Sequence, residues 1–381
     1  MGKPLPPRID PMRILITGSD GFLGTNLRLR LRESGSHDVA GVTEETPHDF
    51  FVEAAASADF VFHLAGVNRP KEEREFAEGN TGFTETLCGL LAAAGRTIPV
   101  VFTSSTQAEL GNSYGRSKLA AEAVLLQHGQ ATGSPIHLLR LTNIFGKWSR
   151  PNYNSAVATF CYNLSRGLPI VINDPIAPLH LVYVDDVMAT FMALLAAPRQ
   201  PGGRVEVEPI FATTVGEVAD ILLSFTESRA SLSTPRVGTG LTRALYATYL
   251  SFLPPEGFAY EVPRHRDPRG EFVEMLKTPD CGQFSYFTAH PGITRGEHYH
   301  HSKTEKFLVI RGSARFGFRQ VETGATHELI TRGGEGRIVE TVPGWTHNIT
   351  NIGDDELIVM LWANEIFDPT NPDTFPLKVD L

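Results

Sequence analysis

The chain has 381 residues, of which 41% are hydrophobic and 20% are charged, and its formal net charge is −9 at pH 7. This length indicates two domains, and the negative charge argues against a nucleic-acid partner, which needs a basic surface. The apolar runs are shorter than a membrane-spanning helix requires, so we expect no membrane contact. Cys88, Cys161 and Cys281 have no paired spacing and suit free thiols in a reducing cytoplasm.

The first two thirds of the chain alternate between apolar strands and amphipathic helices. Residues 1–11 contain four prolines and no periodicity, so we expect a disordered leader or an expression remnant. We predict buried strands at 13–18, 38–43, 58–66 and 99–105, with helices such as 19–35 and 80–95 between them. Because this alternation continues to about residue 195, it predicts an α/β fold of the Rossmann type, a doubly wound parallel sheet covered on both faces.

After about residue 255 the pattern changes to short strands separated by Gly, Asn and Asp turns. We predict these strands at 272–276, 283–290, 306–321, 327–331, 336–342, 347–353 and 356–364. Such a series is typical of an antiparallel all-β domain. The predicted organisation is therefore a first domain at 12–250, a proline-rich linker at 251–264 and an all-β domain at 265–381.

The segment "TGSDGFLG" follows the first predicted strand and opens the first helix. Gly18, Gly21 and Gly24 allow a tight turn that brings the backbone close to a pyrophosphate at the helix N-terminus. We therefore expect this turn, with Phe22 and Leu23, to bind a dinucleotide.

The end of the second predicted strand should contact the ribose of the adenosine. Thr43 stands near that point, followed by Glu44 and Glu45. NAD is usually recognised there by an acidic residue directly at the strand end. Since no acid occupies that position, NADPH is favoured and NADH stays open, with Arg28 or a more distant basic residue meeting the 2′-phosphate.

Tyr114 and Lys118 stand four residues apart in "SYGRSKLAAE" and would share one face of a helix. An ammonium beside the phenol favours its ionised form and makes Tyr114 a useful acid near neutral pH. The strand end "VFTSS" supplies Ser104 and Ser105, and a serine hydroxyl there can polarise a substrate carbonyl. We favour Ser105 for this role, with Ser104 as the alternative.

Over residues 12–250 these motifs resemble the extended short-chain dehydrogenase/reductase family of nucleotide-sugar enzymes. The resemblance implies that Leu64, Ala65 and Gly66 of "HLAG", together with Asn80 and Lys118, line the cofactor. It further implies that "LRLTNIFGKW" and "HLVYVDDV" serve as cofactor-lining or sugar-nucleotide segments. One departure is the short spacing of eight residues between Ser105 and Tyr114: either the intervening loop is trimmed, or Ser104 takes the role.

The late segment "RGEHYHHSKTEKFLVIRG" contains His298 and His300, which are two residues apart and so point to one face of a strand. Glu305 begins the next predicted strand, and His347 arrives from a later one. Three imidazoles and a carboxylate suit zinc or another divalent metal. His301 points to the opposite face, and Lys303 is either a solvated loop residue or a charge facing an anionic substrate.

The spacing of these residues is similar to the two signature motifs of the cupin family, which implies a jelly-roll domain over about 265–375. A reductase followed by a metal cupin resembles the bifunctional capsular and O-antigen polysaccharide enzymes. That resemblance implies a UDP-linked 2-acetamido-2,6-dideoxy-4-hexulose substrate, C3 epimerisation in the cupin and C4 reduction with NADPH. It further implies a UDP-N-acetyl-L-talosamine-type product and a homodimer.

Two alternative interpretations belong to other classes. In the first, the protein has a single activity, and the cupin is a structural or dimer-forming module. In the second, the protein is a non-enzymatic regulator that senses the cofactor. Retention of Ser105, Tyr114 and Lys118 together favours an enzyme.

Overall fold

A computed structural model describes residues 11–35, 37–267, 270–273, 276, 278, 282–365 and 370–380. Residues 1–10 of the predicted leader and Cys281 lie outside this range. The described residues form two compact units: the first contains residues 11–144 and 180–211, and the second contains 145–179 and 212–380. The domain ranges expected from the sequence remain a prediction. Among the described helices, none is both long and apolar enough to cross a membrane.

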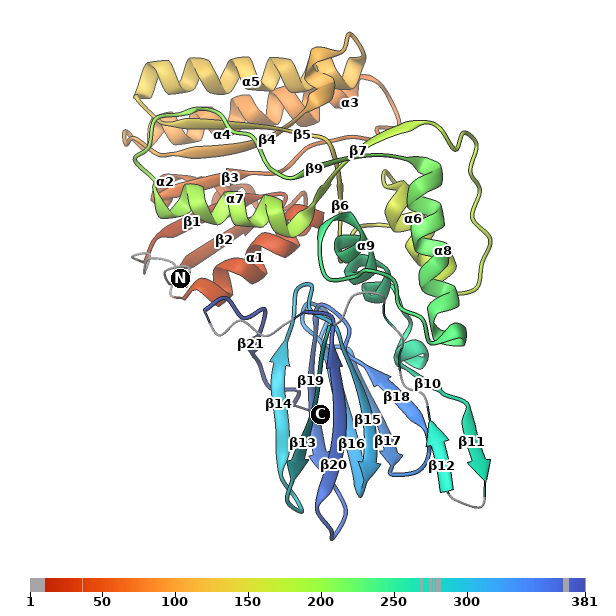
Figure 1. Ribbon diagram of the computed structural model, residues 1–381. Helices are drawn as coiled ribbons and strands as arrows, with labels where there is room; N and C mark the ends of the chain where they lie inside the picture. Colours follow the sequence, from red (N-terminus) through yellow and green to blue (C-terminus); the bar gives the residue numbers. More distant parts are fainter. Residues whose placement is uncertain are drawn as a thin grey trace. The chain divides into compact units, whose positions relative to one another are not determined.

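The first unit is built on a six-stranded sheet in the order β2-β1-β3-β4-β5-β8, and its neighbouring strands are parallel (Figure 1). This topology confirms the predicted doubly wound α/β fold. The strands are β1 (Arg13–Thr17), β2 (Asp38–Val42), β3 (Phe60–His63), β4 (Val100–Ser105), β5 (Ile136–Leu141) and β8 (Gly203–Arg204).

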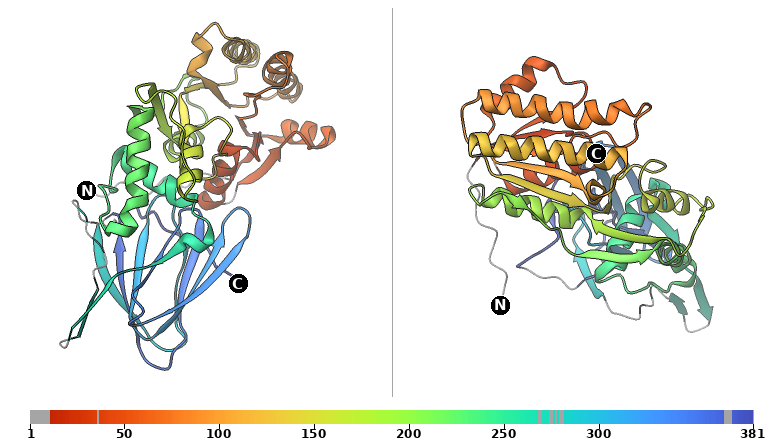
Figure 2. Two further views of the ribbon diagram at one scale, coloured as in Figure 1. Left: turned by 90° about the vertical axis from the view of Figure 1, so that its right-hand side faces the viewer. Right: turned by 90° about the horizontal axis from the view of Figure 1, so that it is seen from above.

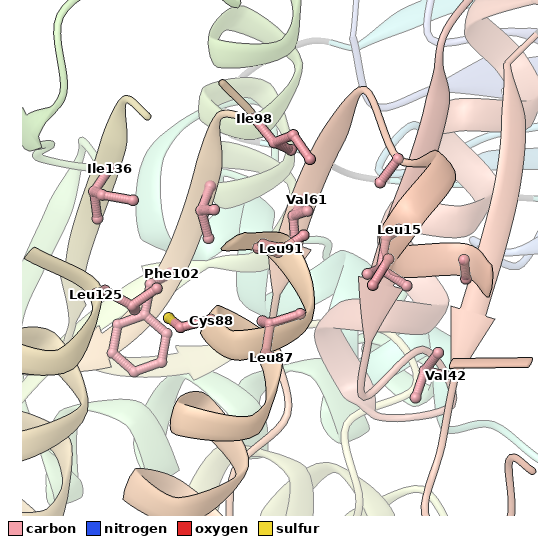
Figure 3. Close-up of a cluster of buried hydrophobic side chains, with 14 of the residues drawn as sticks. Leu15, Val42, Val61, Leu87, Cys88, Leu91, Ile98, Phe102, Leu125 and Ile136 are labelled. Atoms are coloured by element: carbon pink, nitrogen blue, oxygen red, sulfur yellow. The ribbon is translucent and has the colours of Figure 1, made fainter. Parts of the chain in front are cut away.

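Helices cover both faces of this sheet. Successive residues of a strand point to opposite faces, so each strand packs against helices on both sides. Val61 faces a cluster that includes Leu87 of α4 and Leu125 of α5 (Figure 3). Phe62 instead packs against Phe191 of α7, with ring centroids 5.2 Å apart. Figure 1 shows α4 and α5 on one side and α1 and α7 on the other. The helical segments are α1 (Phe22–Ser34), α2 (His48–Ser57), α3 (Arg74–Phe76), η1 (Ala77–Gly82), α4 (Phe83–Ala93), η2 (Thr106–Glu109), α5 (Ser113–Thr132) and α7 (Val184–Ala196).

The second unit contains an antiparallel sandwich of two five-stranded sheets, ordered β10-β18-β15-β20-β13 and β17-β16-β19-β14-β21 (Figures 1 and 2). This arrangement confirms the predicted all-β fold and is consistent with a cupin. Gly312, with φ +89°, divides the long run predicted at 306–321 into two strands. The strands are β10 (Ala259–Glu261), β13 (Gln283–Ala289), β14 (Thr294–Tyr299), β15 (Glu305–Arg311), β16 (Ser313–Gln320), β17 (Thr326–Arg332), β18 (Arg337–Glu340), β19 (Trp345–Asn351), β20 (Leu357–Ala363) and β21 (Phe375–Pro376).

Helical segments pack within the same second unit: α6 (Ala156–Leu164), α8 (Val215–Ser231), α9 (Gly240–Ser251) and η3 (Pro255–Phe258). The predicted linker at 251–264 is thus partly structured, since it contains η3 and the sheet strand β10. Within it, the side chain of Phe258 is fully buried. A separate hairpin joins β11 (Arg264–Asp267) to β12 (Gly270–Val273), and β6 (Asn143–Phe145), β7 (Pro178–Tyr183) and β9 (Ile210–Thr214) make a three-stranded sheet.

Candidate functional site

The turn between β1 and α1 brings the chain close to the end of β3. Gly18 has φ +68°, and a Cβ added there would lie 2.8 Å from the backbone of Ala65. A Cβ on Gly24 would lie 2.3 Å from the carbonyl oxygen of Gly18. Both positions therefore require glycine for steric reasons. Gly21 instead caps α1, and Phe22 and Leu23 begin that helix.

The residues predicted to line the cofactor converge beyond the carboxyl ends of β1 and β3. A Cβ on Gly66 would meet Oδ1 of Asn80 at 2.9 Å and Nζ of Lys118 at 3.0 Å. Asn80 accepts a hydrogen bond from the amide of Val67 at 2.9 Å and donates to Oγ of Ser117 at 2.9 Å. A narrow backbone cradle of this kind suits close approach by a dinucleotide.

Thr43 follows β2, as predicted, and closes a short turn. Its amide donates to Oγ1 of Thr46 at 2.8 Å, and its own hydroxyl accepts from the amide of Glu45 at 3.3 Å. Glu44 and Glu45 are exposed on this turn. The turn after β2 is therefore polar, with its acidic residues one and two positions beyond Thr43.

Ser105 and Tyr114 are brought together by a compact connection. Ser105 caps η2 by accepting a hydrogen bond from the amide of Gln107 at 3.2 Å, and Asn112 caps α5. The eight residues between Ser105 and Tyr114 thus contain η2 and the cap of α5. Ser105 also forms a side-chain hydrogen bond with Tyr114. Ser104 is buried, and its hydroxyl has no hydrogen-bond partner within the described part of the chain.

The electrostatics of Tyr114 differ from the expectation based on its spacing to Lys118. Burial raises the pKa of Tyr114, and the hydrogen bond from Ser105 opposes this only in part. The Lys118 ammonium instead donates to the carbonyl oxygen of Thr103 at 3.0 Å and lies 4.7 Å from the centre of the Phe102 ring. Burial lowers the pKa of Lys118 to about 8. The Tyr114 hydroxyl therefore keeps its proton near neutral pH, and Lys118, on the same helix, is still mostly charged there.

The second predicted site gathers His298, His300, Glu305 and His347, whose ligand atoms all lie within 4.8 Å of one another. Nε2 of His300 lies 3.2 Å from Oε2 of Glu305, and Nε2 of His347 lies 3.5 Å from the same oxygen. His298 pairs with His347 across β14 and β19. A β-bulge precedes His298, and His300 lies just beyond the end of β14. The two imidazoles therefore converge because of the irregular strand end as well as because alternate strand residues share a face.

The charges in this cluster suit a metal cation. Burial, together with the neighbouring imidazoles, lowers the pKa of His298 to about 3, and burial also lowers the pKa of His347. Burial alone would raise the pKa of Glu305, but His300, His347 and Lys303 hold it well below its ordinary value. His298 and His347 are therefore neutral and Glu305 is ionised, which are the protonation states that bind divalent metals. The four residues therefore fit the predicted ion.

Two neighbours of the cluster take different positions. His301 lies outside the ligand group and contacts the rings of Tyr299 and Phe375, with centroids 5.6 Å and 5.0 Å away. Lys303 was expected either to be solvated or to face a substrate. It is buried, and its ammonium lies 3.3 Å from Oε1 of Glu305, so the solvated interpretation was wrong.

Comparisons with known proteins agree with this arrangement. The profile of the NAD dependent epimerase/dehydratase family matches residues 14–207. Over 368 residues the chain is 56% identical to the UDP-2-acetamido-2,6-beta-L-arabino-hexul-4-ose reductase of Pseudomonas aeruginosa, covering 97% of this chain and 99% of that protein. The chain belongs to the NAD dependent epimerase/dehydratase family. As a member of this family it uses an NAD-type cofactor.

Other similarities extend beyond the NAD dependent epimerase/dehydratase region. The profile of the polysaccharide biosynthesis C-terminal domain matches residues 265–375. The capsular polysaccharide assembling protein CapF from Staphylococcus aureus matches with a TM-score of 0.67 at 40% identity, covering 97% of this chain and all of that one. A structure of CapF with the inhibitor 3-isopropenyl-tropolone matches with a TM-score of 0.61 at 36% identity, covering 96% and 99% of the two chains.

Two contributors to these sites were missed by the sequence analysis. Asp373 contacts the turn that carries His300, although 72 residues separate Asp373 from His301. Trp148 packs against Gly344, three residues before His347. Asp373 belongs to no spaced motif, and Trp148 ends the segment "LRLTNIFGKW" without any sign of its contact with Gly344, because both contacts depend on the tertiary fold.

Proposed function

We propose that the protein reduces the C4 ketone of a UDP-linked 2-acetamido-2,6-dideoxy-4-hexulose with NADPH, after epimerising C3 in its cupin domain. The product would be a UDP-N-acetyl-L-talosamine-type sugar for capsule or O-antigen synthesis. The observation that carries the reductase assignment is the pairing of the Ser105 and Tyr114 hydroxyls, with Lys118 one helical turn further along α5. The similarity to the Pseudomonas reductase along nearly the whole chain supports the substrate class.

In the proposed reductase, each of three residues, Ser105, Tyr114 and Lys118, would have its own role in carbonyl reduction. Ser105 would orient the C4 oxygen by hydrogen bonding, and Tyr114 would donate its proton to that oxygen as the C4–H bond forms. The bound nicotinamide supplies the hydride. Lys118 would hold the nicotinamide ribose and keep positive charge near the phenol. Because burial raises the pKa of Tyr114, the proton is retained until the alkoxide develops.

Epimerisation at C3 follows from the acidity that the neighbouring ketone confers. Breaking the C3–H bond yields an enolate, and returning the proton to the opposite face inverts the centre. A metal held by His298, His300, Glu305 and His347 would stabilise the negative charge that develops on the C4 oxygen. Reduction at C4 then removes the acidifying ketone and fixes the new configuration. This order explains why the two activities share one chain.

The deciding experiment measures deuterium uptake at C3 of the UDP-linked 4-ketohexose in heavy water without NADPH. Wild-type protein and His298→Ala are compared, and NADPH affinity serves as the control for an intact first unit. We expect uptake in the wild type and its loss in the variant. Uptake that never exceeds the buffer control would reduce the cupin to a structural module.

The reductase assignment has a separate test, because the regulator alternative makes the opposite prediction. NADPH consumption is followed by absorbance with the same ketone, and kcat/KM is compared between NADPH and NADH. Ketone-dependent consumption that prefers NADPH supports the proposal. Cofactor binding without any turnover of the ketone would favour a cofactor-sensing regulator.

A homodimer and a cytoplasmic location belong to the same proposal. The structure contains one chain, so the dimer is an expectation from the resemblance alone. Analytical ultracentrifugation of the full-length protein distinguishes a dimer from a monomer. Cell fractionation tests the location.

A further inference from the structure

The C-terminal segment of the chain returns to the strand that carries His298. In β21, Pro376 pairs with His298 and Phe375 pairs with Tyr299. The amide of Leu377 donates to the carbonyl oxygen of Glu297 at 2.9 Å. This segment therefore forms an outer strand beside the metal cluster, although about 80 residues separate it from His298 in sequence.

The side chain of Asp373, which immediately precedes this strand, organises the turn between β14 and β15. One carboxylate oxygen accepts from the amide of His301 at 2.9 Å. The other accepts from the amides of Ser302 and Lys303, both at 2.7 Å, and from Oγ of Ser302 at 3.0 Å. Hydrogen bonds from several amides to one carboxylate are charge-assisted and hold a turn firmly. This turn joins His300 to Glu305, so its shape sets the distance between two of the four ligands.

The backbone of the same residue acts directly on His300. The carbonyl oxygen of Asp373 is hydrogen-bonded to Nδ1 of His300. A carbonyl oxygen only accepts, so Nδ1 must carry the hydrogen. In the neutral ring that a metal ligand requires, Nε2 then has the free lone pair, and this is the atom that lies 3.2 Å from Oε2 of Glu305. Metal-bound histidines usually have their second nitrogen fixed in this way, which sets both the tautomer and the direction of the ring.

We propose that Asp373 is a positioning residue of the metal site: its carboxylate fixes the 301–303 turn, and its carbonyl aims Nε2 of His300 at the metal. This inference rests on the proposed metal site but concerns a residue outside the ligand set. Without the carboxylate, the turn loses four hydrogen bonds that tie it to Asp373, and the Asp373 carbonyl and His300 gain freedom to move. Loss of such an outer hydrogen bond costs roughly ten- to hundredfold in metal affinity.

The test compares zinc affinity in Asp373→Ala, Asp373→Asn and Asp380→Ala, using competition with a chromophoric chelator on the full-length chain. Asp380 is an exposed aspartate in the same segment, so Asp380→Ala is a matched control. We expect a weakening of about ten- to hundredfold for Asp373→Ala and a change of less than about twofold for Asp380→Ala. The visible spectrum of the cobalt(II)-loaded protein should change only in the Asp373 variants.

Asp373→Asn keeps the size of the side chain but turns one acceptor oxygen into a donor that faces backbone amides. It decides the question if Asp373→Ala does not fold, as judged by circular dichroism, and we expect it to weaken zinc binding severalfold. Folded Asp373 variants with wild-type zinc affinity and an unchanged cobalt spectrum would overturn the inference. Failure of the metal site itself looks different, since wild-type protein and His298→Ala would then bind zinc equally weakly.

Discussion

Lys306 and Glu340 are direct partners across β15 and β18, and their side chains form an ion pair in the buried part of the sheet. Arg229 of α8 pairs with the second oxygen of the same carboxylate, and the Lys306 ammonium donates to the hydroxyl of Tyr260 at 2.9 Å. Burial would raise the pKa of Glu340, but the two cations lower it below the ordinary value of 4.5. One carboxylate therefore balances two cations brought from a helix and a strand.

We expect Glu340→Gln to lower the free energy of unfolding by about 3–5 kcal/mol, because it leaves Lys306 and Arg229 without their shared anion. Urea denaturation at pH 7 measures this loss. Because the pKa of Glu340 is lowered on folding, its stabilisation is present above pH 4.5 and disappears as the pH falls through the folded-state value. The difference between wild type and variant should therefore shrink in acid. Glu328→Gln, which alters an exposed pair with Arg315, should change stability by less than about 1 kcal/mol.

Tyr114→Phe should lower the reductase kcat by at least about a hundredfold, because the phenol is the proposed proton donor. NADPH affinity, measured by fluorescence titration, should stay within about twofold, since the ring itself is retained. Tyr286→Phe makes the same chemical change at a side chain that is 72% exposed and should leave both quantities unchanged. A wild-type kcat in Tyr114→Phe would show that another group donates the proton.

Lys118→Met should make the protein more stable at pH 7 but less active as a reductase. Burial lowers the pKa of Lys118 to about 8, so the folded protein carries a penalty for the charge below that pH. Removing the charge should raise the free energy of unfolding at pH 7 by about 2 kcal/mol, after allowance for the lost hydrogen bond to Thr103. The reductase kcat/KM should fall by about a hundredfold or more.

The difference in stability between wild type and Lys118→Met should also depend on pH. Between about pH 8 and the ordinary lysine pKa of 10.5, the unfolded chain binds more protons at this position than the folded chain. Wild-type stability should therefore rise relative to Lys118→Met as the pH increases from 7 to 9. Lys71→Met, at an exposed position, should show no such trend. If the stability of Lys118→Met relative to wild type grew with pH, that result would contradict the lowered pKa of Lys118.

Gly344→Ala should destabilise the second unit for two reasons. Gly344 has φ +81°, and an added Cβ would lie 2.8 Å from Cζ2 of Trp148. Gly324→Ala is the matched control, because Gly324 has φ +74° with open space around it. Both substitutions carry the backbone strain, so thermal denaturation should show an additional cost of about 1–3 kcal/mol for Gly344→Ala. Trp148→Leu should relieve that additional cost, and equal costs for the two alanine variants would exclude the steric contact.

Much of this molecule follows from local patterns in the sequence. Gly18, Tyr114 and Lys118 stand at fixed spacings near the ends of predicted elements, so alternation of strand and helix is enough to place them. The metal cluster was likewise predicted, since His298 and His300 are close in sequence and Glu305 begins the next strand. These relationships depend on secondary structure and on the pairing of nearby strands.

The rest depends on contacts between distant segments. Asp373 reaches the 301–303 turn only because β21 pairs with β14, and Arg229 reaches Glu340 only because α8 packs against the sheet. The position of the Lys118 ammonium is a further example. Its helix spacing to Tyr114 was evident, but the carbonyl of Thr103 at the end of β4 determines where Nζ lies. Spacing indicates which residues share a face, whereas tertiary packing decides which partner each side chain takes.

The second unit draws its chain from both sides of the predicted boundary near residue 250. Arg229 and Trp148 come from before it, and Glu340 and Gly344 come from after it. A fragment beginning at residue 265 would keep Lys306 and Glu340 but lose Arg229, Tyr260 and the indole that covers Gly344. Recombination at residue 265 would therefore yield a β-sandwich with an exposed seam of charged and apolar groups. Exchange of the cupin with another reductase would succeed only if helix α8 and the loop containing Trp148 moved with it.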